Sequence, residues 1–239
     1  MTGSNGLIGS HLYSQLEVQS TITSIDSDDG LSEKDYFNLD LTDINQVNSF
    51  GEDCDHFDVL IFLVGLAHKK GKGKELSEFR DVNTQTLINL LTALKEQGKI
   101  PNKIIFASTI SVYGEKYNQN IYDEDSEQKP FSPYAVTKLE AEQYLLNNFP
   151  DKSWILRFAP VYASNFQLNI YRRTKTGGWF YKVGSGSKKL SLCNLENIGS
   201  AVQGILADKA IPGIYNISDE NEYSYNDLLY HVNAKWVIP

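Results

Sequence analysis

Two short, almost wholly apolar runs limit the fold more than any other feature of this sequence. Residues 59–64 read Val-Leu-Ile-Phe-Leu-Val and stop at Gly65, and residues 103–107 read Lys-Ile-Ile-Phe-Ala and stop at Ser108 and Thr109. A strand with one solvent-exposed face alternates apolar and polar side chains, whereas a strand buried on both faces is continuously apolar. Both runs therefore predict strands of a parallel sheet that helices cover on each side.

Helix-like and strand-like segments alternate around these two runs. Such alternation is typical of a Rossmann-like, doubly wound α/β sheet, whose ligands bind at the carboxyl ends of the strands. After residue 160 the pattern weakens, so we expect one sheet domain at 1–160 and a smaller, partly interleaved and incomplete lobe at 161–239. Further strands are expected at 20–25, 36–40 and 154–158, and helices at 7–16, after Thr42 or Asp43, at 75–98 and at 132–148.

The chain opens on three regularly spaced glycines, Gly3, Gly6 and Gly9, which run straight into the segment 7–16. Glycines ahead of a helix let the backbone approach a pyrophosphate, which the positive end of the helix also attracts. Asp26 follows 23 residues after Gly3 (26 minus 3), where a carboxylate can bind a ribose diol and repel a 2′-phosphate, so NAD is favoured over NADP. A tight turn for the glycines, and simple turn chemistry for Asp26, are the alternatives.

No strand precedes this glycine loop in the sequence. In a doubly wound sheet that strand is central, so we expect strand edges exposed on both sides of the gap and a loop anchored at one end only. Residues 233–239, Asn-Ala-Lys-Trp-Val-Ile-Pro, read like the point where a lobe would continue. We therefore expect a chain shortened at its N-terminus and at its C-terminus, with poor solubility or weak NAD binding.

Composition argues against several classes of function. The formal net charge of -8 opposes general attraction to nucleic acid or to anionic membrane surfaces. Cys54 and Cys193 are isolated, without the spacing of a zinc site or of a disulfide framework. No run approaches the roughly 18 apolar residues of a membrane span, and no signal-peptide pattern is found. We expect a soluble cytoplasmic protein that binds no metal, nucleic acid or membrane.

A tyrosine and a lysine stand four residues apart in the segment Ser-Pro-Tyr-Ala-Val-Thr-Lys at 132–138. Ser132 and Pro133 are a strong helix start, so Tyr134 and Lys138 share one face of a helix. An ammonium beside a phenol stabilises the phenolate and lowers the tyrosine pKa from about 10, which makes the tyrosine usable as a base. An aromatic residue and a lysine on an ordinary surface helix are the alternative for the isolated pair.

The order of these motifs resembles one protein family. Ser108-Thr109, Val112-Tyr-Gly114, Tyr134 and Lys138 follow a glycine loop as they do in the extended short-chain dehydrogenase/reductases, and in particular in the NAD-dependent epimerase/dehydratase family that acts on sugar nucleotides. The resemblance covers nearly the whole chain, through the segments TGSNGLIGSHL, NLDLTD, FLVGLAH, VNTQTLINLL, FASTISVYGE, SPYAVTKLEAEQYL and LRFAPVY. It implies an NAD-binding domain followed by a substrate-binding lobe, and a homodimer built through the helices at about 75–98 and 132–148.

The resemblance also implies roles for individual residues. Thr109 would hydrogen-bond the reacting oxygen of the sugar, Tyr134 would be the catalytic acid and base, and Lys138 would bind the nicotinamide ribose and lower the Tyr134 pKa. The implied cofactor-binding residues are Gly3, Asn5, Gly6, Leu7, Ile8, Gly9, Asp26, Asp40, Leu41, Leu63, Val64, Gly65, Asn83, Tyr134, Lys138 and Pro160. The implied substrate-binding residues are Thr109, Ser111, Asn165 and Arg172. Asn83 as a polar residue inside a helix, and Asn165 as a helix cap, remain alternatives.

The two positions after the implied catalytic threonine separate the reactions of this family. They are Asp and Glu in the 4,6-dehydratases and Ile110 and Ser111 here, so the acid and base that eliminate water are lacking and dehydration is disfavoured. The resemblance then implies epimerisation at carbon 4 of a UDP-hexose or UDP-N-acetylhexosamine through a transient ketosugar, in polysaccharide biosynthesis. An NAD(P)H-dependent ketosugar reductase and a non-catalytic truncated family member are the alternatives.

Overall fold

The structure, a computed structural model, describes residues 1–27, 35–67, 75–114, 121–235 and 237–238 of the 239-residue chain. The chain divides into two compact units. Unit 1 comprises Met1–Arg157 and Val202–Asn216, and unit 2 comprises Phe158–Ala201 and Ile217–Pro239. The chain therefore leaves unit 1 after residue 157 and returns to it for fifteen residues, 202–216.

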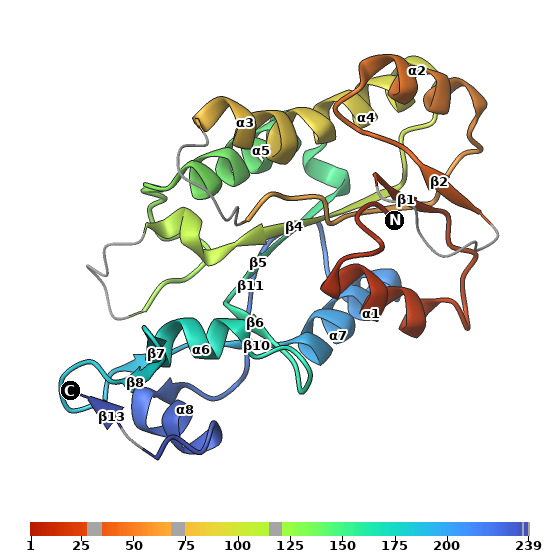
Figure 1. Cartoon of the computed structure of the whole chain (residues 1–239). Helices are drawn as coiled ribbons and strands as arrows, with labels where there is room; N and C mark the ends of the chain where they lie inside the picture. Colours follow the sequence, from red (N-terminus) through yellow and green to blue (C-terminus); the bar gives the residue numbers. More distant parts are fainter. Residues whose placement is uncertain (28–34, 68–74, 115–120, 236, 239) are drawn as a thin grey trace. The chain divides into compact units, whose positions relative to one another are not determined.

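Unit 1 is built around parallel strands, with the two apolar runs side by side (Figure 1). β3 (Val59–Phe62) and β4 (Lys103–Thr109) pair in parallel, and all but their first residues are buried. The sheet order is β11-β5-β4-β3, and β1 pairs in parallel with β2. The parallel α/β sheet predicted from the sequence is confirmed. The remaining strands named here are β1 (Ser24–Asp26), β2 (Tyr36–Asn38), β5 (Ser153–Phe158) and β11 (Gly213–Ile217).

Helices lie on both faces of this sheet. In Figure 1, α2 to α5 lie on one face and α1 lies on the other. Two of the helices begin at predicted caps: the Asp43 carboxylate accepts from two amides of the first turn of α2, and the Ser132 hydroxyl accepts from the Ala135 amide of α5. The bounds are α1 (Leu7–Leu16), α2 (Ile44–Asp53), α3 (Leu76–Arg80), α4 (Thr86–Glu96) and α5 (Pro133–Asn148), with the short 3-10 turns η2 (Ile110–Tyr113) and η3 (Pro150–Lys152).

The segment 76–96 is helical, as predicted over 75–98, but its middle is not α-helical. Between α3 and α4, residues Asp81–Gln85 form a π-helix, η1. Its wider turn faces α5, where Asn83 Nδ2 donates to Thr137 Oγ1 at 3.0 Å and Thr84 Oγ1 donates to the Thr137 carbonyl at 2.8 Å. A π-turn inserts one residue, which changes the face on which the later side chains fall while the backbone stays helical.

The first two residues of the chain lie between β1 and β3. Thr2 forms parallel bridges with Ile25 of β1 and with Phe62 of β3. The Thr2 amide donates to the Ile61 carbonyl at 3.0 Å, and the Gly3 amide donates to the Ile25 carbonyl at 2.9 Å. The glycine loop is therefore held from both sides, contrary to the expectation of a loop anchored at one end, because two residues suffice to reach both neighbouring strands.

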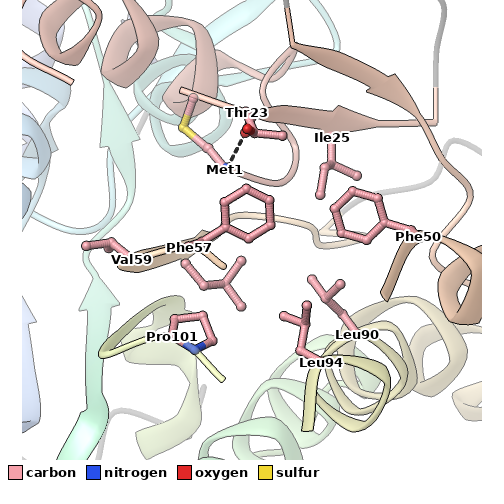
Figure 2. Close-up of a pocket in the computed structure, with 10 residues that line it drawn as sticks. Met1, Thr23, Ile25, Phe50, Phe57, Val59, Leu90, Leu94 and Pro101 are labelled. Carbon is pink, nitrogen blue, oxygen red and sulfur yellow. Dashed lines mark hydrogen bonds between the residues drawn. The ribbon is translucent and has the colours of Figure 1, made fainter. Parts of the chain in front are cut away.

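An apolar pocket lies beside Met1 (Figure 2). The Met1 ammonium donates to the Thr23 carbonyl at 2.6 Å, and burial lowers the pKa of this ammonium to about 5. The pocket lies within unit 1. The lining residues are Met1, Thr23, Ile25, Phe50, Phe57, Val59, Leu60, Leu90, Leu94 and Pro101.

Unit 2 is smaller and is made of short elements. Its apolar cluster contains Ile170, Leu192 and Leu228. The helix α7 (Leu195–Leu206) contributes residues to both units. The other elements are β6 (Val161–Tyr162), α6 (Leu168–Thr174), β7 (Lys175–Thr176), β8 (Trp179–Tyr181), β9 (Lys189–Leu190), β10 (Cys193–Asn194), β12 (Tyr223–Ser224), α8 (Tyr225–His231) and β13 (Val237–Ile238).

Three further observations bear on possible ligands. Within the described segments, no helix has both the length and the apolar character needed to cross a membrane. Over the same residues, no three His, Cys, Asp or Glu side chains are grouped so that they could hold a metal ion. Cys54 and Cys193 are buried free thiols.

Candidate active site

The glycine loop packs closely on the end of β3 and on α1. Gly3 has a φ of 69°, and a Cβ at this residue would lie 3.2 Å from the Leu63 carbonyl carbon. A Cβ on Gly9 would lie 2.2 Å from the Gly3 carbonyl oxygen, so a larger residue would force the loop away from α1. α1 begins after Gly6 with no side-chain cap and no acidic residue in its first turn. This helix end is therefore suited to an anion.

Asp26 ends β1 beside the same loop. Its Oδ2 accepts from the Asn5 amide at 2.9 Å, and its Oδ1 accepts from the Ser27 amide at 2.9 Å. Asn5 in turn donates from Nδ2 to the Tyr36 hydroxyl of β2 at 3.2 Å. The Asp26 carboxylate stands at the carboxyl end of β1, as expected of a ribose-binding residue. It also closes a turn, as expected of simple turn chemistry.

The end of β3 brings Leu63, Val64 and Gly65 against the loop and against α5. A Cβ on Gly65 would lie 2.9 Å from Lys138 Nζ and 3.6 Å from Asn83 Oδ1. Lys138 Nζ donates to the Val64 carbonyl at 3.1 Å. The absence of a side chain at Gly65 is thus what lets the lysine reach the end of β3.

Lys138 is almost completely buried, with 3% of its surface exposed. Its Nζ lies 4.7 Å from the centre of the Phe106 ring. Burial lowers the pKa of the Lys138 ammonium to about 7, and the negative charge of Glu142 acts in the opposite direction. A lysine with this pKa gains or loses its proton near neutral pH, whereas a lysine in water does not.

Tyr134 lies one helical turn before Lys138 and hydrogen-bonds Thr109. Burial raises the pKa of Tyr134 to about 12, and the hydrogen bond with Thr109 opposes this rise. Thr109 Oγ1 also accepts from the Ser111 amide at 3.2 Å. The expected lowering of the Tyr134 pKa by Lys138 is not found, because the lysine is directed to the Val64 carbonyl and burial reduces its charge.

Asn83 is fully buried in η1. Its Oδ1 accepts from the Leu66 amide at 2.6 Å, while its Nδ2 donates to Thr137 Oγ1 at 3.0 Å. The amide therefore joins the segment after β3 to α5. Asn83 lies beside Gly65 and Lys138. Its side chain is also hydrogen-bonded inside a helical segment, which is the alternative interpretation of this residue.

Asp40 and Leu41 lie just before α2. Asp40 is exposed, and its Oδ1 accepts from the Thr42 hydroxyl at 2.7 Å. The Leu41 side chain belongs to the hydrophobic core, and its carbonyl accepts from Asn89 Nδ2 at 3.1 Å. Of these two predicted cofactor residues, Asp40 is the one whose side chain is open to solvent.

Pro160 and Arg172 belong to unit 2. The Pro160 carbonyl accepts from the Cys193 amide at 3.1 Å, which ties the segment after β5 to β10. Arg172 is exposed on α6 beside Arg173. An exposed guanidinium on a helix is free to meet a phosphate group.

Asn165, also in unit 2, is exposed at the tip of a tight turn. Ala163 and Phe166 exchange backbone hydrogen bonds across this turn at 2.9 and 3.0 Å. The N-cap residue of α6 is Gln167. Asn165 is therefore not a helix cap, and its side chain projects from a turn instead.

Sequence reasoning missed a buried ion pair behind the site. Arg157 of β5 donates from Nη2 to Glu142 Oε2 at 2.7 Å, and both side chains are 1% exposed. The Ser108 hydroxyl of β4 also donates to the Glu142 carboxylate. The available signal is an arginine inside the apolar strand 153–158, since a buried charge requires a partner. A second signal is that Glu142 lies four residues after Lys138 on the same helical face.

Comparison with known proteins gives a family match over most of the chain. The NAD dependent epimerase/dehydratase family matches residues 1–218. The N-acetyl-alpha-D-glucosaminyl-diphospho-ditrans,octacis-undecaprenol 4-epimerase of Escherichia coli O157:H7 is 26% identical over 243 residues, which cover 97% of this chain and 70% of that protein. An uncharacterized UDP-glucose epimerase of Bacillus subtilis (strain 168) is 31% identical over 182 residues, which cover 68% of this chain and 56% of that protein.

Solved structures share the fold. The UDP-glucose 4-epimerase of Thermus thermophilus, in complex with NAD, gives a TM-score of 0.79 at 23% identity and covers 100% of this chain and 84% of its own. The UDP-glucuronic acid 4-epimerase of Bacillus cereus, in complex with NAD, gives a TM-score of 0.76 at 24% identity and covers 97% and 80%. The chain belongs to the NAD-dependent epimerase/dehydratase family, whose members are enzymes with NAD as cofactor.

Proposed function

We propose that this protein epimerises a nucleotide-linked sugar, a UDP-hexose or UDP-N-acetylhexosamine, at carbon 4 through a transient ketosugar. The observation that carries the proposal is the hydrogen-bonded pair Thr109 and Tyr134, one helical turn from Lys138. This group stands at the carboxyl ends of β3 and β4, beside the glycine loop, where ligands of doubly wound sheets bind. The 4-epimerases among the similar proteins support the choice of carbon 4.

The residues of unit 1 fit NAD. The uncapped start of α1 suits the pyrophosphate, and Gly3 and Gly65 lie where a Cβ would press on the backbone of β3 or on Lys138. Ser4 Oγ is buried without a hydrogen-bond partner among the described residues, so a donor or acceptor on a ligand would satisfy it. Asp26 would bind the ribose diol. Bound NAD would supply a hydride acceptor that later returns the hydride to the opposite face of the sugar.

Tyr134 and Thr109 would handle the proton. In the first half-reaction the sugar O–H bond breaks, the proton passes to the Tyr134 oxygen, and Thr109 holds the sugar oxygen by a hydrogen bond. In the second half-reaction Tyr134 returns the proton to the same oxygen, so the enzyme ends as it began. Tyr134 must begin as phenolate, and with a pKa of about 12 in the protein alone it is protonated at neutral pH. A protonated Lys138 would favour the phenolate once the ligands exclude water.

Dehydration and reduction are the rival reactions. Ile110 and Ser111, which follow Thr109 in η2, carry no carboxylate to eliminate water, and the Ser111 amide is used to fix Thr109 Oγ1. A reductase would use the same three residues but would consume NADH with each turnover. A non-catalytic family member would bind NAD without turning over any sugar.

The predicted substrate-binding residues Arg172 and Asn165 are both exposed in unit 2, and a guanidinium and an amide suit phosphate oxygens. The named substrate of the Escherichia coli relative is a sugar diphosphate on a polyprenol and not on a nucleotide. A polyprenyl diphosphate sugar therefore belongs in the substrate panel beside the UDP-sugars.

We also propose a homodimer that packs α4 and α5 of two copies together, in the cytoplasm. α3 and α5 are already joined within one chain by Arg80 and Glu140, which form two hydrogen bonds of 2.8 and 2.6 Å. The free thiols Cys54 and Cys193 suit a reducing compartment. Light scattering of the purified protein tests the dimer, since a mass of one chain would contradict it.

The decisive experiment incubates the protein with catalytic amounts of NAD and each of several UDP-hexoses, UDP-N-acetylhexosamines and a polyprenyl diphosphate sugar, followed by separation of the 4-epimers. Formation of the epimer without net change in NADH supports the proposal. A parallel reaction supplies NADH and a nucleotide-linked ketosugar, and stoichiometric NADH consumption there identifies a reductase. NAD binding without any product identifies a non-catalytic protein. Either of the last two results contradicts epimerisation.

A further inference from the structure

A buried carboxylate joins the elements that carry the candidate active site. Glu142 lies on α5 one helical turn after Lys138. Its carboxylate accepts from Arg157 of β5, through Nη2 at 2.7 Å and Nε at 3.2 Å, and from the Ser108 hydroxyl of β4. One side chain therefore ties α5, β4 and β5 to one another.

This tie acts one residue away from Thr109. Ser108 directly precedes Thr109 at the end of β4, and Thr109 hydrogen-bonds Tyr134 in the first turn of α5. Tyr134, Lys138 and Glu142 are spaced four residues apart, so they lie along one face of α5. A shift of α5 along β4 that separated Thr109 from Tyr134 would also strain the bond between Ser108 and Glu142.

Arg157 is itself held in place. Its Nη1 donates to the Tyr113 hydroxyl at 2.8 Å, and its guanidinium lies 4.8 Å from the centre of the Tyr113 ring. The Tyr113 hydroxyl donates onward to Asn216 Oδ1 at 2.7 Å. A planar guanidinium fixed in this way also fixes the carboxylate that it binds.

Stability alone is a poor explanation for this pair. Taking two charges out of water costs several kcal/mol per ion in typical cases, and apolar residues of similar volume often replace such a pair without loss of stability. The Arg157 and Glu142 side chains are each 1% exposed, so this pair carries the full cost of desolvation. Its position between the strand that carries Thr109 and the helix that carries Lys138 points to a role in the site.

Glu142 also bears on the charge of Lys138. The Lys138 pKa is lowered chiefly by burial, and the Glu142 charge is the influence that raises it. The groups that face the same carboxylate are Arg157, from β5, and Ser108, from β4. Arg157 stays charged over the whole working range of pH.

We propose that Glu142 is a positioning residue. Through Ser108 and Lys138 it keeps the Thr109 hydroxyl of β4 and the Tyr134 phenol of α5 in one arrangement. This inference rests on the proposed function, because the arrangement matters only if Thr109, Tyr134 and Lys138 act on a substrate.

The first test replaces both charges, Glu142→Leu with Arg157→Met, so that neither charge is left buried alone. We expect a melting temperature within a few degrees of the wild type, and a kcat lower by about tenfold or more with KM for the sugar changed less than about threefold. A stable double variant with wild-type kcat would overturn the proposal.

A milder variant decides the question if the double variant does not fold. Ser108→Ala leaves the ion pair intact and removes only the hydrogen bond from Ser108 to Glu142. We expect kcat to fall about three- to tenfold and Ser108→Thr to restore it. The matched control is Ser153→Ala in β5, where a fully buried hydroxyl donates to the Phe149 carbonyl at 2.8 Å. Equal loss of stability in both variants with unchanged kcat in both would contradict a positioning role.

A third measurement needs no turnover. Lysine labelled with carbon-13 at Cε lets the titration of Lys138 be followed by NMR in the wild type and in Glu142→Gln. We expect a lower titration midpoint in the variant, and an equal midpoint would overturn the action on Lys138. If the wild type epimerises no sugar, the proposed function fails, while this titration still decides whether Glu142 acts on the lysine.

Discussion

At the scale of the residue, Tyr134 is the group whose single oxygen matters most to the proposed reaction. Tyr134→Phe removes the proton carrier and leaves the ring in place, so kcat is expected to fall about a thousandfold, within the usual range for a lost acid and base. NAD affinity and melting temperature should change little. The control is Tyr144→Phe on the same helix, where the ring packs edge-on against Phe149. Steady-state kinetics check this, and wild-type kcat in Tyr134→Phe would refute the assignment.

Gly65 gives a second prediction at this scale. In Gly65→Ala the new Cβ would start 2.9 Å from Lys138 Nζ, the far end of a flexible side chain, so the fold should survive while the ammonium moves. We expect NAD affinity about tenfold weaker, measured by calorimetry and equal to a loss of about 1.4 kcal/mol, because the displaced ammonium would no longer reach the ribose. Gly204→Ala in α7, with no atom within 4 Å of its Cβ, is the control and should bind NAD normally. Undiminished binding by Gly65→Ala would show that Lys138 does not touch the cofactor.

At the scale of the element, α5 carries Tyr134, Lys138 and Glu142, so its first turn should influence both stability and function. The Ser132 hydroxyl accepts from the Ala135 amide at 3.3 Å. Ser132→Ala is expected to cost about 1 kcal/mol and about 2–4 °C of melting temperature, since one first-turn amide loses its partner.

Ser132→Asp, which keeps a capping oxygen, should retain the wild-type melting temperature in the same thermal scan. Because Tyr134 lies in the uncapped turn, kcat should fall more in Ser132→Ala than in a variant of equal stability altered elsewhere. Equal melting temperatures for Ser132→Ala and Ser132→Asp would mean that this cap contributes nothing.

At the scale of the whole molecule, two buried ammonium groups set how stability depends on pH. The Met1 pKa falls from 8.0 to about 5 on folding, and the Lys138 pKa falls from 10.5 to about 7. Between each pair of values the unfolded chain binds more protons than the folded chain, so stability rises with pH. Without NAD, we expect the free energy of unfolding to increase from pH 5 to 8 through Met1 and from pH 7 to 10.5 through Lys138.

Urea titrations at a series of pH values measure this dependence. The controls are Lys138→Met, which should remove the rise above about pH 8, and a chain acetylated at Met1, which should weaken the rise below it. Stability that stays constant from about pH 5 to 10 would contradict the burial of both groups. Asp43, whose pKa is lowered by its hydrogen bonds to Gln46 and Asn45, contributes in a separate, acidic range, since its stabilisation is lost only as pH falls through its folded pKa.

Much of unit 1 follows from local sequence pattern. The apolar runs 59–64 and 103–107 predicted strands, which the structure has at 59–62 and 103–109. The caps Asp43 and Ser132 mark helix starts that the structure confirms. The pattern fails where one extra residue forms the π-turn η1, because the segment stays helical there and the insertion changes only the face on which later side chains fall. It also gives no sign that residues 202–216 return to unit 1, because that pairing joins segments far apart in the chain.

The candidate site was likewise predictable from the sequence only in part. The sequence by itself determined the order of strands and helices, the glycines and the face shared by Tyr134 and Lys138, because each depends on residues a few positions apart. Only the tertiary structure decided that Lys138 points to the Val64 carbonyl, that its pKa lies near neutrality and that Arg157 finds Glu142 and Ser108. Burial and charge pairing depend on which distant segments contact each other in the folded chain, and local sequence periodicity does not encode those contacts.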